Sequence, residues 1–214
     1  MQDYVHLAKD FGFTDAALLP VADLVVVPAY RCFCEENLCG NYDVLPVCPP
    51  MSGTVEEMTA NMRRYQTALV LTIETTPNCY TDKAEQKAAK RAQNILTEQL
   101  MDQMRADGQT DLLMMGAGPW KTASCMSAYC VDAQKMADAV HMKCWENDGK
   151  IRYFSLILFG QARQRKTPRP SMMDAGSFYV SVCFAALRFR RRGRRRFGAL
   201  ASFSYTAFSS SLGS

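Results

Sequence analysis

Short apolar runs alternate with segments of helical periodicity over the first 159 residues of the chain. An unbroken apolar run bounded by turn residues predicts a buried strand, whereas apolar residues spaced by three and four predict a helix. The predicted strands lie at 16–19, 24–27, 68–73, 112–115 and 151–159. The predicted helices lie at 3–11, 54–66, 82–106 and 131–142, with one further helical turn within 30–37. Because strands alternate with helices, we predict an α/β domain with a small mixed sheet, packed helices and a cysteine-rich loop segment.

Two of the helices begin with a capping box, in which an N-cap side chain and a Glu three residues later satisfy backbone N–H groups. Thr54 with Glu57 opens one helix, and Asp82 with Glu85 opens the other. The apolar face expected for the second helix consists of Ala88, Ala92, Ile95, Leu96, Leu100 and Met104. Its basic residues are interpreted as a solvated face rather than a binding surface; they are Lys83, Lys87, Lys90 and Arg91.

The composition changes after Phe159. Residues 1–159 hold 14 Lys and Arg against 20 Asp and Glu, a net charge of −6, whereas residues 160–214 hold 11 basic residues against one acid, a net charge of +10. Seven arginines fall between Arg188 and Arg196. Because this segment has no helical or strand period, we predict a disordered basic low-complexity tail at 160–214 beside a domain at 1–159. An out-of-frame or otherwise non-homologous extension would have the same composition.

The N-terminus lacks the cationic and apolar regions of a secretory signal, and no apolar run approaches the roughly 20 residues that span a bilayer. We therefore expect a cytoplasmic protein without a membrane span. In a reducing compartment, clustered cysteines favour metal binding or catalysis over disulfides, and the odd total of nine cysteines agrees with this.

Residues 31–50, RCFCEENLCGNYDVLPVCPP, hold four of the nine cysteines. Cys34, Cys39 and Cys48 are separated by turn residues, and their thiolates suit zinc, Cu(I) or the iron of Fe–S clusters. Cys32 is a candidate fourth ligand, one residue away from Cys34 in a C-x-C pair. The alternative is a ligand from elsewhere in the chain: Cys79, Cys125, Cys130, Cys144 or His141.

Catalytic chemistry has little support in the sequence. Two histidines leave little material for acid–base catalysis, and no Ser or Cys nucleophile has a recognisable base partner. Gly116-Ala117-Gly118 follows a predicted strand, but Lys121 stands where a dinucleotide-binding motif has its third glycine. Whether the chain is an enzyme stays open, and no substrate is predicted.

The string CEENLCGNY at 34–42, followed by Cys48-Pro49-Pro50, resembles a bacterial and archaeal family of predicted metal-binding proteins, the domain of unknown function 2284. The resemblance extends over roughly residues 1–159, through the strand ALVLTI, the Gly116-Ala117-Gly118 turn and the segment MSAYCVD at 126–132. It implies a metal site in which Cys34, Cys39 and Cys48 are thiolate ligands and the cofactor is an Fe–S cluster or zinc.

The chain departs from the family pattern in two places. Family members carry a second cysteine group of the form C-x2-C-x2-C after the Gly116-Ala117-Gly118 turn, but residues 119–125 contain only Cys125. Part of the family's expected site is therefore missing. The arginine-rich tail also has no counterpart in the family.

Three functions are considered. The first is metal binding by Cys34, Cys39, Cys48 and Cys32, with electron transfer to a redox partner protein as a further expectation for an Fe–S cluster. The second is binding of nucleic acid or another polyanion through the tail. The third is a thiol redox protein, in which Cys32 and Cys34, or Cys34 and Cys39, cycle through a disulfide. This requires a lowered thiol pKa; Arg31 is the only adjacent cation, and Glu35 and Glu36 oppose it.

Overall fold

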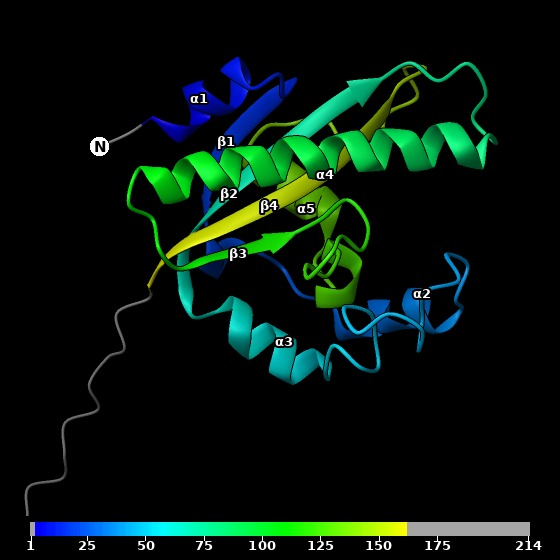
Figure 1. Ribbon diagram of the computed structural model, residues 1–214. Helices are drawn as coiled ribbons and strands as arrows, with labels where there is room; N and C mark the ends of the chain where they lie inside the picture. The colour runs from blue at the N-terminus through cyan, green and yellow to red at the C-terminus, as the bar shows by residue number, and fades with distance from the viewer. Residues whose placement is uncertain (1–2, 162–214) are drawn as a thin grey trace, which may run out of the picture. The chain divides into compact units, whose positions relative to one another are not determined.

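A four-stranded sheet with strand order β1–β2–β4–β3 forms the centre of the domain (Figure 1). The computed structural model describes residues 3–161. The strands are β1 (Asp15–Pro20), β2 (Tyr65–Thr75), β3 (Leu112–Met115) and β4 (Ile151–Gln161). The α-helices are α1 (Tyr4–Asp10), α2 (Cys32–Glu35), α3 (Val55–Met62), α4 (Lys83–Ala106) and α5 (Ala133–Ala139). Three short 3₁₀ helices are η1 (Val21–Asp23), η2 (Pro28–Arg31) and η3 (Met126–Tyr129).

The predicted α/β class, with packed helices and a cysteine-rich loop segment, is confirmed. The three strand pairs among the described residues are all antiparallel, where strand–helix alternation had favoured a mixed sheet. The reason lies in the last strand. β2 and β3 are joined by α4 and run in the same direction, but β4 lies between them and pairs antiparallel with both.

β2 and β4 are covered on both faces, which explains their continuous apolar sequences. Ala68 and Val70 of β2 belong to the core that includes the buried residues of α3, η3 and α5. Leu69 and Leu71 belong to the opposite core, with the buried residues of α1 and α4. Alternate residues of one strand thus serve two helical layers.

Two predicted segments differ in the structure. The run at 24–27 is not a strand of the sheet; Val26 makes one isolated antiparallel bridge with Val131, and Pro28 starts η2 directly afterwards. The helix predicted at 54–66 has the expected capping box but ends at Met62, because β2 begins at Tyr65.

The apolar face predicted for α4 is correct only in its second half. Leu100 and Met104 are buried, whereas Ala88, Ala92 and Ile95 are exposed. The inner face of the first half is polar instead, and it consists of Gln93, Asn94 and Thr97. Gln93 Nε2 donates to Leu71 O at 3.1 Å and to Ser155 Oγ at 2.8 Å, and Thr97 Oγ1 lies 2.6 Å from Ser155 Oγ. Gln93 Oε1 is buried without a hydrogen-bond partner among residues 3–161.

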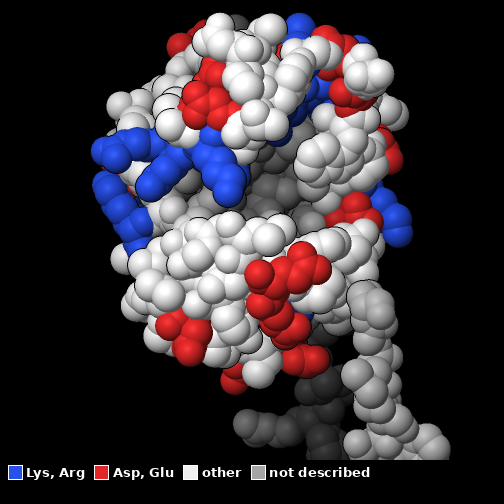
Figure 2. All heavy atoms as spheres, turned by 90° about the vertical axis from the view of Figure 1, so that its right-hand side faces the viewer, with Lys and Arg blue, Asp and Glu red and all other residues white. Residues whose placement is uncertain are grey.

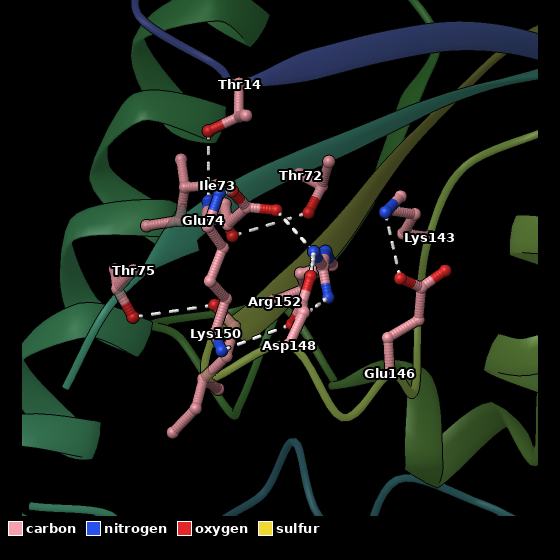
Figure 3. A network of polar contacts seen from close by, with 11 residues as sticks. Thr14, Thr72, Ile73, Glu74, Thr75, Lys143, Glu146, Asp148, Lys150 and Arg152 are labelled. Atoms are coloured by element: carbon pink, nitrogen blue, oxygen red, sulfur yellow. Dashed lines mark hydrogen bonds and ion pairs between the residues drawn. The ribbon is translucent and has the colours of Figure 1, made fainter.

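A group of ion pairs ties the end of β2 to the start of β4 (Figure 3). The Arg152 side chain is only 4% exposed and contacts both Glu74 Oε2, at 2.6 Å, and Asp148. Lys150 pairs with the other oxygen of Glu74. The hydrogen bond from Lys150 lowers the pKa of Glu74, and the hydrogen bond from Arg152 lowers the pKa of Asp148. Among residues 3–161, no helix is long and apolar enough to cross a membrane.

Gly116→Ala is expected to destabilise the domain, because an added Cβ would lie 2.5 Å from Gly118 O and 2.8 Å from Asn94 Oδ1. Overpacking of this kind costs about 1–3 kcal/mol in the free energy of unfolding. Gly118→Ala is the matched control, since its nearest contact is Lys90 Cδ at 3.9 Å. Urea denaturation measures both, and equal stabilities of the two variants would contradict the packing described.

The ion pairs of Glu74 and Asp148 are expected to make stability fall at acid pH. Since the folded-state pKa values of both carboxyls are lowered, their stabilisation is present above the unfolded-state pKa values. It is lost as the pH falls below the unfolded-state values and through the lower folded-state values. Urea midpoints measured from pH 6 down to 3 test this. The variant Glu74→Gln/Asp148→Asn should show a shallower decline than wild type, whereas Asp10→Asn, which removes a carboxylate outside this group, should not.

Candidate metal site

The cysteine-rich segment is docked against η3 by backbone hydrogen bonds. Val27 N–H donates to Cys130 O at 2.9 Å, and Asp132 N–H donates to Val25 O at 2.9 Å. These bonds flank the Val26–Val131 bridge. α2, which follows directly, therefore lies in contact with η3. Two segments far apart in sequence meet here, each with two cysteines: Cys32 and Cys34 in α2, and Cys125 and Cys130 at the ends of η3.

The rest of the cysteine-rich segment is held by local turns. Asn37 adopts a left-handed conformation, accepts the N–H of Gly40 at 3.0 Å through its backbone, and accepts the N–H of Tyr42 at 3.0 Å through its side chain. Cys48 N–H donates to Leu45 O at 2.8 Å, and Cys48 is buried. Cys39 lies on the exposed turn. The turns thus present one buried and one exposed thiol towards the same side as Cys34.

The thiols of Cys34, Cys39, Cys48 and Cys125 lie close enough to influence one another's ionisation. Burial raises the pKa of Cys34 to about 11, with Cys125 as the next cause and Arg31 acting in the opposite direction. Burial also raises the pKa of Cys48 to about 11, followed by the effects of Cys125 and Cys39. The charge of Cys125 thus acts on both Cys34 and Cys48, and the charge of Cys130 also acts on Cys34. The role of Cys34, Cys39 and Cys48 as metal ligands stays a prediction.

Cys32 and Cys34 both lie within reach of Cys130, whose charge also acts on Cys34. Residues two apart in a helix point in nearly opposite directions, and both cysteines belong to α2. The charge of Cys32 acts on Cys130, whose pKa is raised chiefly by burial and lowered by Arg31. The role of Cys32 as a ligand stays a prediction.

The remaining candidates lie outside this group. Cys144 belongs to the apolar core under the sheet, where burial raises its pKa to about 11. Cys79 is exposed in the turn before α4, where hydrogen bonding by Thr81 lowers its pKa. His141 is exposed just after α5. All three therefore behave as isolated side chains.

Cys125 and Cys130 are the residues that sequence reasoning left among the alternatives. Their spacing was the available signal, because Cys125-x4-Cys130 repeats the spacing of Cys34-x4-Cys39. Nothing in the sequence indicated that residues 25–27 pair with residues 130–132. The proximity of Cys32 and Cys34 to Cys125 and Cys130 depends on this pairing.

The donors present fit a thiolate metal site in their chemistry, since Cys34, Cys39, Cys48 and Cys125 are all free thiols. Their side chains are gathered without being closed around a common point. Among residues 3–161, no three His, Cys, Asp or Glu side chains have the geometry to hold one metal ion.

A family model described as "Predicted metal-binding protein (DUF2284)" matches residues 17–125. The resemblance drawn from the sequence is confirmed, over a shorter range than 1–159. The match ends at Cys125, and MSAYCVD and β4 lie beyond it. No curated protein and no solved structure was found to match the chain.

The cysteines outside the group are expected to differ widely in reactivity with iodoacetamide. Cys79 should be modified early, because it is exposed and its pKa is lowered. Cys144 should be modified last, because it is buried and its pKa is raised. Mass spectrometry of the native chain over a time course at neutral pH checks the order. Modification of Cys144 as early as Cys79 would contradict the burial described.

Proposed function

The chain belongs to this family of predicted metal-binding proteins, and on that premise we propose that Cys34, Cys39, Cys48 and Cys125 hold its metal as a four-thiolate centre. The observation that carries the proposal is the pairing of residues 25–27 with residues 130–132, which puts α2 in contact with η3 and so brings cysteines from two distant segments near one another. Four thiolates are the donor set of structural zinc and of Fe–S clusters alike.

The protein's part in this centre is to bring the two segments together and to supply negative donors. Residues 31–48 provide three ligands, and the loop between β3 and η3 provides the fourth. The cysteine group that family members carry after the Gly116-Ala117-Gly118 turn is thereby replaced by one residue, Cys125. Bound zinc would cross-link the two segments, whereas an Fe–S cluster would add one-electron chemistry for exchange with a redox partner protein.

Arg31 has a supporting position in this proposal. It lies in η2, its guanidinium contacts Met58 Sδ at 3.5 Å, and its charge acts on both Cys34 and Cys130. A centre with four thiolates and a divalent ion carries a net negative charge, which a neighbouring guanidinium partly offsets. Arg31 therefore stabilises the charged thiolates without being a ligand.

The alternative of nucleic-acid binding through the arginine tail concerns residues outside the described range 3–161, and it stays a prediction. The thiol redox alternative also stays a prediction. For it, the structure offers Cys32 and Cys130 as neighbours, beside Arg31.

Full-length protein purified anaerobically is expected to contain either zinc, or iron with sulfide and a visible absorption band. Cys34→Ser, Cys39→Ser, Cys48→Ser and Cys125→Ser should each lower the metal content by about tenfold or more, because a missing ligand costs a large share of the binding free energy. Elemental analysis and sulfide determination make the measurement.

Cys79→Ser is the matched control, since Cys79 is exposed and outside the group; it should keep the wild-type metal content. A comparison of the single variants Cys32→Ser and Cys125→Ser identifies the fourth ligand. Loss of metal from Cys32→Ser with full retention by Cys125→Ser would replace Cys125 by Cys32 in the set. Wild-type metal content in all of the variants would refute the proposed four-thiolate centre.

A further inference from the structure

The first three turns of α4 carry four exposed basic residues, Lys83, Lys87, Lys90 and Arg91. Within residues 3–161, none of the four forms an ion pair. Neighbouring like charges three and four residues apart destabilise a helix. We call Lys83, Lys87 and Lys90 the basic row, because they follow one side of the helix.

The acid nearest to the basic row is already engaged. Glu85, in the first turn of α4, accepts the backbone N–H groups of Asn78, at 3.1 Å, and of Cys79, at 3.3 Å. Glu98, further along the helix, pairs with Lys121 at 2.7 Å and accepts from Trp120 Nε1 at 3.3 Å. The charge of the basic row is therefore left for a partner outside these contacts.

The basic row points along the loop that follows β3. Lys90 lies against Gly118, and Asn94, one turn further on, accepts the N–H of Ala117 at 2.9 Å. Two further cations flank the ring of Trp120 in the same loop: the Arg91 guanidinium is 5.9 Å from the ring centroid and Lys121 Nζ is 5.6 Å from it. Cations from α4 and from the loop thus meet around one aromatic side chain.

The molecule is hollowed on this side. α4 begins on the right of Figure 1, above α2, and this side faces the viewer in Figure 2. Figure 2 shows Lys and Arg side chains gathered beside a hollow, with Asp and Glu side chains on the part below it. On the lower part, Glu35 and Glu56 line a separate shallow pocket of about 290 Å³ next to Arg31.

We propose that the basic row, together with Arg91 and Trp120, binds a multiply charged phosphate anion. Lysine ammonium groups bind phosphate as point charges, and an arginine guanidinium adds a forked donor. With a rise of 1.5 Å per residue, the row from Lys83 to Lys90 is about 10 Å long, so more than one phosphate group contacts it at once. The hollow suits a small ligand better than the flat surface of a partner protein.

The phosphates belong either to a free oligophosphate or to a nucleotide. The difference between these sources lies at Trp120, since a nucleoside base stacks on an aromatic ring whereas a phosphate chain does not. The site does not depend on the proposed metal centre: the basic row is on α4, and the thiols of that centre belong to the segments at 34–48 and to the far end of the loop, at Cys125.

The experiment uses the full-length chain with Trp145→Phe, which leaves Trp120 as the one fluorescent indole of the chain's two tryptophans. Sodium tripolyphosphate is titrated while the emission of Trp120 is recorded. Saturable binding is expected, weakening as NaCl is raised because the contacts are exposed charges. Lys87→Gln/Lys90→Gln should weaken binding about tenfold, the effect of removing two charge-assisted contacts.

Lys135→Gln/Lys143→Gln is the matched control, because it removes the same charge from exposed lysines on and after α5. It should change the affinity less than about twofold, a net-charge effect alone. Equal weakening by both double variants, or no response of Trp120, would overturn the proposal, since binding would then be a property of net charge or of the basic tail.

Two further titrations separate the remaining questions. ATP in place of tripolyphosphate distinguishes the sources: tighter binding of ATP with strong quenching of Trp120 identifies a nucleotide, and equal affinity identifies the phosphate chain. Cys48→Ser is expected to bind tripolyphosphate with the affinity of wild type. The anion site is therefore tested independently of whether the proposed metal centre exists.

Discussion

The pairing of residues 25–27 with residues 130–132 is the constraint on which the candidate site depends. Two hydrogen bonds and one bridge place α2 beside η3, and only this contact brings the cysteines of the first segment to those of the second. Both flanks are anchored in the core, through Leu24 on one side and Met136 on the other. A thiol cluster on otherwise exposed turns is thereby fixed to the rigid part of the domain.

Features that depend on neighbouring residues were predictable from the sequence. β2 and β4 follow from their apolar runs, and the start of α3 from Thr54 and Glu57. The inner face of α4 was not predictable, because Gln93 and Thr97 are buried only where Ser155 of a distant strand meets them. The strand order was not predictable for a related reason: the sequence shows that β4 exists, but its place between β2 and β3 is decided by packing across the sheet.

The candidate site divides in the same way. Cys34, Cys39 and Cys48 were proposed as ligands from their spacing within one segment. The sequence left five alternatives for a further ligand, and Cys125 is proposed among them only on the basis of the fold. The charges show a further contrast. Those around Arg152 are paired and serve to join two strands, while those at the start of α4 have no acidic partner within residues 3–161 and are gathered beside a hollow. The net charge of residues 1–159 does not distinguish the paired charges around Arg152 from the basic residues of α4 that have no acidic partner within residues 3–161.

The position of β4 has a consequence for the order in which the domain assembles. β4 is the last strand in sequence but an inner strand of the sheet, and β3 has no other strand partner among the described residues. During synthesis, β1 and β2 can pair early, while β3 and the loop that carries Cys125 wait for residues 151–161. The proposed four-thiolate centre, which takes cysteines from both halves, would therefore be complete only at a late stage of folding. Metal delivered earlier would meet the three cysteines of residues 34–48 alone, and a fragment confined to residues 17–125 would lack the strand that holds the fourth in place.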